Sequence, residues 1–189
     1  MPGPWSPPGN QPAPFYIGNE AHQGIADFYR GLHPFDPVFT NSSSLAAIAP
    51  WLGGDPAGLG NADLLRPDIL NARTREIYEI KPAGSEPAGA AQLAMYMRAL
   101  SGAGVTGLVP GAAGALGTVG AIPAPGGAYA FASLSSGIIS YRYIPTGSPL
   151  FLGLPDLKGG PVVVVGAATM AVVAAIVAPE LYILAPAAL

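Results

Sequence analysis

Two short runs of residues, 68–70 and 77–80, flank a polar turn at residues 73–75. Short strand-like runs on either side of a polar turn predict a β-hairpin. If the turn is centred between its first two residues, opposing residues have numbers that sum to 147. Asp68 then lies directly across from Glu79, with Cβ atoms about 4.5–5.5 Å apart. The hairpin is therefore predicted to place two carboxylates next to each other.

Alternation along the second run decides which side chains share a surface with these acids. Lys81 follows Glu79 by two residues, so both point to the same face of the strand. Tyr78 and Ile80 point to the opposite face, where we expect a core. Two like charges placed this close repel each other unless a cation lies between them. Two acids and a lysine on one face are therefore predicted to form a divalent-metal site.

Length and composition limit the classes of protein that need to be considered. The 189 residues suffice for one domain with appendages. Charged residues make up 10% of the chain, against roughly 25% in ordinary globular proteins. The absence of cysteine excludes disulfides and thiolate metal sites, and the presence of only two histidines argues against a histidine-rich zinc site.

The net charge argues against a general affinity for nucleic acid. It is −3 at pH 7, with a pI near 5.2, so no bulk positive field attracts a polyphosphate. A cation bound between the acids would reverse the sign of the charge locally. A nucleic-acid substrate is therefore compatible with this chain only through such a site.

Changes in composition divide the chain into three parts. Residues 1–14 form a Pro-rich tail, which we expect to be extended because proline interrupts helices and central strands. This amino terminus lacks the basic segment followed by an apolar segment that marks a signal peptide. Residues 15–145 carry the predicted elements of one domain, and residues 146–189 form a hydrophobic C-terminal region.

Apolar residues at helical spacing predict a helix on each side of the first hairpin. The upstream helix covers residues 18–32, with Asn19 as N-cap and Glu20 in the first turn, where a carboxylate suits the helix dipole. The downstream helix covers residues 88–100 and places Gln92 on the same face as an aromatic residue four positions later. Both helices are expected to flank the hairpin.

Further elements are predicted between and after these helices. Polar residues at 41–44 would cap a short helix that extends to residue 52. The tract at 102–127 is rich in Gly, Ala and Pro, and we expect a loop with one short strand near residues 119–122. Alternating residues at 129–134 and 138–144 predict a second hairpin. The expected order is helix, hairpin, helix, hairpin, with the short helix before the first hairpin.

The C-terminal region contains an uncharged run from Val162 to Ala178. About 20 apolar residues are needed to cross a bilayer, so this run is of marginal length for a membrane span. Its many small residues suit close helix packing, either within a membrane or against protein. The sequence thus predicts a hydrophobic helical segment and leaves its surroundings open.

The motif Pro-Asp, an interval and Glu-x-Lys resembles the signature of the PD-(D/E)xK, or restriction-endonuclease-like, nuclease superfamily. The resemblance covers about residues 18–145 and rests on Pro67-Asp68, Glu79-Ile80-Lys81, the early acid Glu20 with His22, and the later pair Gln92 and Tyr96. It implies an α/β fold with a mixed central sheet flanked by helices. It also implies metal-dependent hydrolysis of nucleic-acid phosphodiesters.

The residue types assign a role to each position of such a site. Asp68, Glu79 and the backbone carbonyl of Ile80 would supply the hard oxygen ligands that Mg²⁺, or Mn²⁺ in its place, prefers. Lys81 would hold the attacking water and stabilise charge on the phosphate. Glu20 would complete the site or bind a second metal, or else it is only an acid near a helix N-terminus.

Three other side chains are candidates for contact with the substrate. Gln92 would orient substrate or water, with an interhelix hydrogen bond as the alternative, whereas Tyr96 is expected to pack in the core. His22 would approach the scissile phosphate, or else it is an inert helix residue. Arg66 and Arg98 would clamp phosphates, or else they are solvated or salt-bridged.

The sequence Arg-Pro-Asp-Ile, followed by Tyr-Glu-Ile-Lys-Pro, is similar to sequences in nuclease-like domains of bacterial polymorphic toxins and secreted effectors. That similarity implies a secreted or delivered effector that acts in the cytoplasm of a target cell. It also implies an immunity protein or a delivery apparatus as partner.

Two other classes of function fit the same sequence. The chain is alternatively a catalytically silent structural or cargo protein of a secretion apparatus, which its low charge favours. It is alternatively a membrane-active protein that works through residues 161–189.

Overall fold

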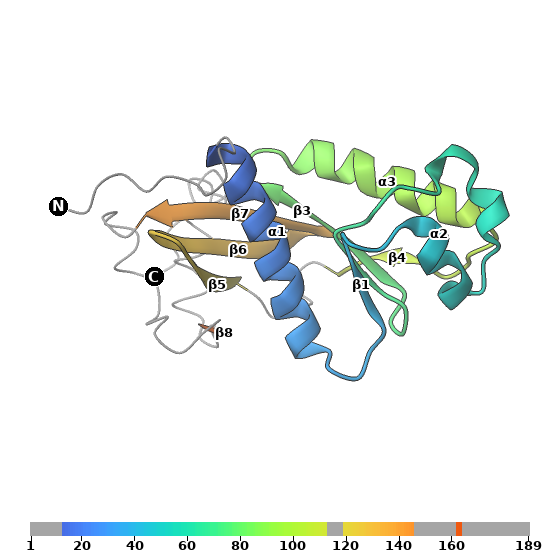
Figure 1. Cartoon of the computed structure of the whole chain (residues 1–189), viewed down its shortest axis with the longest axis horizontal. Helices are drawn as coiled ribbons and strands as arrows, with labels where there is room; N and C mark the ends of the chain where they lie inside the picture. Colours follow the sequence, from blue (N-terminus) through green and yellow to red (C-terminus); the bar gives the residue numbers. More distant parts are fainter. Residues whose placement is uncertain (1–12, 113–118, 146–161, 164–189) are drawn as a thin grey trace, which may run out of the picture.

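The computed structural model describes residues 13–112, 119–145 and 162–163. This part of the chain is a mixed α/β structure built on a curled sheet (Figure 1). The strands are β1 Val38–Thr40, β2 Ile69–Asn71, β3 Glu76–Pro82, β4 Val109–Pro110, β5 Val119–Ala124, β6 Gly127–Ser135, β7 Ile138–Pro145 and β8 Val162–Val163. The helices are α1 Ala13–Leu32, α2 Leu45–Ile48 and α3 Glu86–Gly102, with 3₁₀ segments η2 Ala49–Leu52 and η3 Pro56–Ala62.

The sheet order is β1-β2-β3-β7-β6-β5-β8, and β4 pairs with the start of β3. Strand β3 pairs antiparallel with β2 and parallel with β7, so the sheet is mixed as expected. A parallel neighbour needs a crossover connection, which α3 helps to provide between β3 and β7. The later strands β5, β6 and β7 form an antiparallel meander.

The predicted register of the first hairpin is confirmed. Ile69 pairs with Tyr78 and Leu70 pairs with Ile77, so the numbers of opposing residues sum to 147. The turn residue Arg75 adopts a positive φ of 59°, which lets the chain reverse in a short loop. This register aligns position 68 with Glu79 and fixes the geometry of the site.

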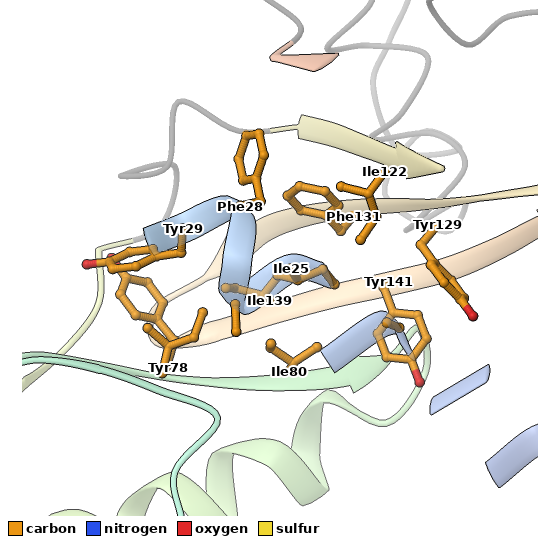
Figure 2. Close-up of a cluster of buried hydrophobic side chains, with 13 residues drawn as sticks. Ile25, Phe28, Tyr29, Tyr78, Ile80, Ile122, Tyr129, Phe131, Ile139 and Tyr141 are labelled. Carbon is orange, nitrogen blue, oxygen red and sulfur yellow. The ribbon is translucent and has the colours of Figure 1, made fainter. Parts of the chain in front are cut away.

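Helices cover both faces of β3. Tyr78 and Ile80 pack against α1 in one core cluster with Ile25 and residues of β5, β6 and β7 (Figure 2). Ile77 points to the opposite face, into a second cluster with Leu93 and other residues of α2, η2, η3 and α3. Alternation along the strand therefore places Glu79 and Lys81 on the α3 side, with the apolar core of α1 behind them.

Helix α1 starts earlier than the sequence predicts. It begins at Ala13 instead of Gly18, so Asn19 is not its N-cap and Glu20 is not in its first turn. Proline is tolerated in the first turn of a helix because the N–H groups there have no intrahelical acceptor. Pro14 therefore belongs to the helix and not to the expected Pro-rich tail of residues 1–14, of which residues 1–12 lie outside the described residues.

The other predicted elements of the core are confirmed in outline. The downstream helix is α3, Ser44 caps α2 through a bond to the N–H of Ala47, and β6 and β7 form the second hairpin. The short strand expected near residues 119–122 is β5. Between Ala132 and Ser135 the β6–β7 register shifts, which is typical of a β-bulge.

The hydrophobic C-terminal region lies mostly outside the described residues. Its described part, Val162–Val163, is strand β8 and not helix, because it pairs with the edge of β5. Among the residues that the structure describes, no helix is both long and apolar enough to cross a bilayer. The predicted helical segment and the membrane role of residues 161–189 therefore stay predictions.

Candidate functional site

The candidate site forms where β3 continues past the start of β2. Strand β2 begins at Ile69, whereas β3 runs on to Pro82. In the hairpin register the residue opposite Ile80 is Pro67, which has no N–H to donate. The Asp68 carboxylate takes the place of the missing strand, since its Oδ2 accepts the backbone N–H of Ile80 at 2.8 Å.

Helix α1 contributes His22 to the second oxygen of this carboxylate. His22 Nδ1 lies 2.8 Å from Asp68 Oδ1, and the imidazole ring meets the ring of Tyr141 edge-on, with centroids 5.9 Å apart. Asp68 is 6% exposed, whereas the His22 side chain keeps 22% of its surface. The imidazole therefore lies between the buried acid and solvent.

Glu79 is the most deeply buried acid of the cluster. Its Oε1 accepts a hydrogen bond from Lys81 Nζ at 2.7 Å, and the residue is 1% exposed. Its Oε2 is buried and has no hydrogen-bond partner among the described residues. A buried carboxylate oxygen without a partner is rare in native proteins and calls for a proton, a water or an ion.

The burial and the neighbouring charges of Glu79 explain why its carboxylate favours a bound proton or cation. The pKa of Glu79 is raised from 4.5 to about 8: burial raises it most, the negative charge of Asp68 also raises it, and Lys81 acts in the opposite direction. The Asp68 carboxylate is thus close enough to make the second negative charge unfavourable. A proton or a metal cation at this position would relieve the repulsion.

A chain of hydrogen bonds from α3 fixes the lysine. Lys81 Nζ donates to Gln92 Oε1 at 2.9 Å, the Gln92 amide donates to the Tyr96 hydroxyl, and that hydroxyl donates to the carbonyl of Arg66 at 2.9 Å. Tyr96 is buried, as expected. Gln92 therefore positions Lys81, and the chain ties α3 to the residue just before the Pro-Asp motif.

Gly89 is a positioning residue that the sequence did not single out. A Cβ built on it would lie 2.8 Å from Lys81 Cγ and 3.2 Å from Ile138 Cδ1. The absence of a side chain lets the aliphatic stem of Lys81 pass beneath α3. A glycine inside a helical pattern lowers its stability and often has a packing reason, and this was the available signal.

Glu20 lies apart from the acid pair. Its Oε2 accepts the hydroxyl of Tyr129 at 3.1 Å, and it lines a separate groove between α1 and β5. The described residues contain no group of three or more His, Cys, Asp or Glu that could hold a metal. The site therefore has His22, not Glu20, beside Asp68, and the role of Glu20 as a ligand stays a prediction.

The predicted phosphate clamps Arg66 and Arg98 are exposed.

The donor set fits one hard cation. Mg²⁺ usually retains several waters and binds through one or two protein carboxylates, so a cluster of three acids is not required. Asp68 and Glu79 supply the carboxylates, and the partnerless Oε2 supplies an open ligand atom. The carbonyl of Ile80 faces the same strand edge as its N–H, which Asp68 binds.

Comparisons with known proteins add no family to this geometry. No family model matches the chain, and no significant match is found among curated proteins or solved structures. The candidate function therefore rests on the residues of the site.

Proposed function

We propose that this protein is a Mg²⁺-dependent nuclease that hydrolyses phosphodiester bonds of nucleic acid. The observation that carries the proposal is the buried Glu79 Oε2, which has no donor among the described residues and lies in the field of Asp68. The lysine beside this pair supports it, as does the mixed sheet with helices on both faces. Together these features agree with the resemblance to the PD-(D/E)xK superfamily.

Each side chain has one task in this proposal. Asp68, Glu79 and the Ile80 carbonyl hold the ion, with Mn²⁺ as a substitute for Mg²⁺. The ion, when bound, polarises the phosphate and lowers the pKa of a coordinated water. A lysine ammonium has three protons, and Lys81 uses two of them on Glu79 and Gln92. The third proton is available to the attacking water or to the charge that develops on the phosphate.

Solvent reaches the site through its two basic side chains. Lys81 keeps 18% and His22 keeps 22% of the side-chain surface exposed. The scissile phosphate would approach between them, with the Lys81 ammonium on one side and the buried acids beneath.

Cleavage assays test the proposal. Purified protein is incubated with single- and double-stranded DNA and with RNA, in Mg²⁺, in Mn²⁺ and in EDTA. Lys81→Ala should lower metal-dependent cleavage by about 10²–10³-fold, the size expected for loss of one preorganised charge-stabilising donor. The matched control is Lys158→Ala, which alters the only other lysine of the chain. Absence of metal-dependent cleavage by the wild type would overturn the proposal.

Calorimetry separates metal binding from catalysis. Titration with Mn²⁺ should give a binding isotherm for the wild type and for Lys81→Ala, and none for Glu79→Gln. Binding that survives the loss of the Glu79 charge would place the ion elsewhere. In its biological setting we propose a secreted effector that acts in a target cell, with an immunity protein as the expected partner.

The depth of the acid pair favours a second candidate function. With Glu79 at 1% and Asp68 at 6% exposure, the cluster also suits a catalytically silent structural or cargo protein. In that case the wild type binds no Mn²⁺, and 10 mM Mg²⁺ leaves the unfolding temperature of the protein unchanged. A bound ion at about 100 times its Kd would instead add roughly 2.7 kcal/mol to the free energy of unfolding.

A further inference from the structure

A groove between α1 and β5 lies away from the acid pair. It has a volume of about 630 Å³ and is lined mainly by apolar atoms, with Phe28 and Leu32 on the α1 side and Ile122 and Pro123 on the β5 side. Figure 2 shows Phe28 and Ile122 on neighbouring elements of the same core cluster. An apolar hollow of this size on a domain surface marks a binding surface.

The C-terminal region is attached to one wall of this groove. Strand β8 pairs antiparallel with β5, with Val162 opposite Ala121 and Val163 opposite Gly120. The next residues of β5, Ile122 and Pro123, line the groove. The uncharged run that follows β8 is therefore tethered beside an apolar surface, which gives it a high effective concentration there.

The direction of β8 leads the chain to one end of the groove. Tyr129 bonds to Glu20 and pairs with Ile122, whereas the ring of Phe28 contacts Phe131, which pairs with Gly120. Moving along α1 toward its C-terminus thus corresponds to moving backward along β5. Because β8 also runs backward along β5, its C-terminal residue Val163 is the one on the side of the last turn of α1.

The length and composition of the segment 164–178 also match the groove. Between Glu20 and Leu32, α1 rises by about 18 Å, and residues 164–178 would span about 22 Å even if they were fully helical. These residues carry no charge and include Gly and several Ala residues. On the α1 side, a Cβ on Gly31 would meet nothing within 4 Å, so the helix leaves room there for a close neighbour.

We propose that residues 164–178 of this chain dock in the α1–β5 groove. The run then buries its apolar side chains against the domain that carries it. This intramolecular contact is independent of the nuclease proposal, because no residue of the acid pair lines the groove.

Hydrogen exchange of the full chain tests this docking. Amides of residues 164–178 should be protected in the wild type, and Gly31→Lys should lower that protection about 10-fold or more. The new lysine puts charge and bulk into the groove, and a cation suits the C-terminal end of a helix, so the fold is retained. The matched control is Asn19→Lys, which adds the same charge to an exposed position of α1 outside the groove.

Crosslinking gives a second readout that does not depend on exchange rates. The chain has no cysteine, so a Gly31→Cys, Ala168→Cys variant contains one possible intramolecular pair. Under mild oxidation it should form a monomeric disulfide faster than an Asn19→Cys, Ala168→Cys variant. Equal rates for the two variants would contradict the docking.

Three outcomes overturn the proposal. If the amides of residues 164–178 are unprotected in the free protein, the proposed contact does not form. Protection that rises with protein concentration, together with a dimer in sedimentation, assigns the groove to a second copy of the chain. Protection that appears only with vesicles of phosphatidylcholine and phosphatidylglycerol assigns residues 164–178 to a membrane.

Discussion

Two clusters of acidic and polar groups lie at opposite ends of the first hairpin, and they differ in whether both oxygens of a carboxylate have hydrogen-bond partners. At the turn end, Asp36 accepts hydrogen bonds from Asn71 at 2.9 Å and from Arg73 at 3.0 Å, and its Oδ2 also lies 3.1 Å from His33 Nδ1. The Asn71 bond lowers the pKa of Asp36 most, and Arg73 and His33 lower it further against the effect of burial. Both oxygens of Asp36 have partners.

At the other end, the Glu79 carboxylate is paired on one side only. Lys81 binds Oε1, and Oε2 is left facing the field of Asp68, so the pKa of Glu79 is raised. The first cluster is complete as the chain folds, whereas the second needs a proton or cation to complete it. A satisfied cluster stabilises a fold, and a buried cluster that is left incomplete is a candidate for a site with a function.

The largest difference between the two clusters is expected when one acid of each is neutralised. Glu79→Gln should reduce metal-dependent cleavage by about 10²–10³-fold and leave the unfolding midpoint at pH 7 nearly unchanged, because it removes a charge that the apoprotein holds poorly. Asp36→Asn should lower the unfolding midpoint and leave cleavage unchanged. Cleavage and thermal denaturation of both variants check this, and the reverse pattern would exchange the roles of the two clusters.

A second variant measures how much the turn cluster stabilises the fold. Asn71 is fully buried, and its amide also donates to the Tyr29 hydroxyl at 3.3 Å and accepts the N–H groups of Arg73 and Thr74. Asn71→Ala should lower the free energy of unfolding by about 2–3 kcal/mol, since it leaves several buried or turn groups unpaired. Urea denaturation measures the loss.

The control for that variant is Thr74→Ala, which removes an exposed side chain of the same turn. It should change the free energy of unfolding by less than about 0.5 kcal/mol. Equal losses for the two variants would show that the turn, and not the buried amide, provides the stability.

The two clusters should also be distinguished by pH. In the apoprotein the folded-state pKa of Glu79, about 8, exceeds its value of 4.5 in the unfolded chain, so the native state binds more protons between these values. Stability from this group is therefore present below pH 4.5 and is lost as the pH rises to 8, with a slope of up to about 1.4 kcal/mol per pH unit. Denaturation at several pH values in EDTA measures it.

Glu79→Gln should abolish this slope, and saturating Mg²⁺ should reduce it, because the ion replaces the proton. Asp36 works in the opposite direction: its pKa is lowered, so its contribution is lost as the pH falls through the acid range. A wild-type stability that rises between pH 5 and 8 in EDTA would contradict the raised pKa of Glu79.

The smallest expected effect comes from the glycine beneath α3. Gly89→Ala should lower cleavage about 3–10-fold by displacing Lys81, and the better helix propensity of alanine, about 0.5–1 kcal/mol, should offset most of the strain. Gly102→Ala in the same helix is the control, because its Cβ would make only an ordinary contact at 3.6 Å. Activity and melting temperature of both variants provide the measurement.

The parts of the site that the sequence predicted are those set by local geometry. The turn and the period-two alternation determine that Asp68 opposes Glu79 and that Lys81 shares their face, and the register confirms this hairpin. The helical period likewise places Gln92 and Tyr96 together, and they share a hydrogen bond. Such relations depend on residues within one element or one short turn.

The parts that the sequence did not predict depend on distant elements. His22 reaches Asp68 across 46 positions because α1 packs on the face of β3 that carries Tyr78 and Ile80, and no local pattern encodes that packing. The predicted start of α1 at Gly18 is wrong, because proline is acceptable in the first turn of a helix although it interrupts a helix further in. The bond from the Tyr129 hydroxyl to Glu20 likewise joins residues far apart in the sequence, and the role of Glu20 as a ligand stays a prediction.

The carboxylate of Asp68 stands in for a strand, and this has a consequence for experiments with inactive variants. Asparagine at this position keeps an oxygen for the Ile80 amide, whereas alanine leaves a bare edge with an unclaimed donor. Bare edges recruit strands from other molecules. Asp68→Ala is therefore expected to self-associate on concentration, and Asp68→Asn is the inactive form to choose for crystallisation or for trapping a substrate.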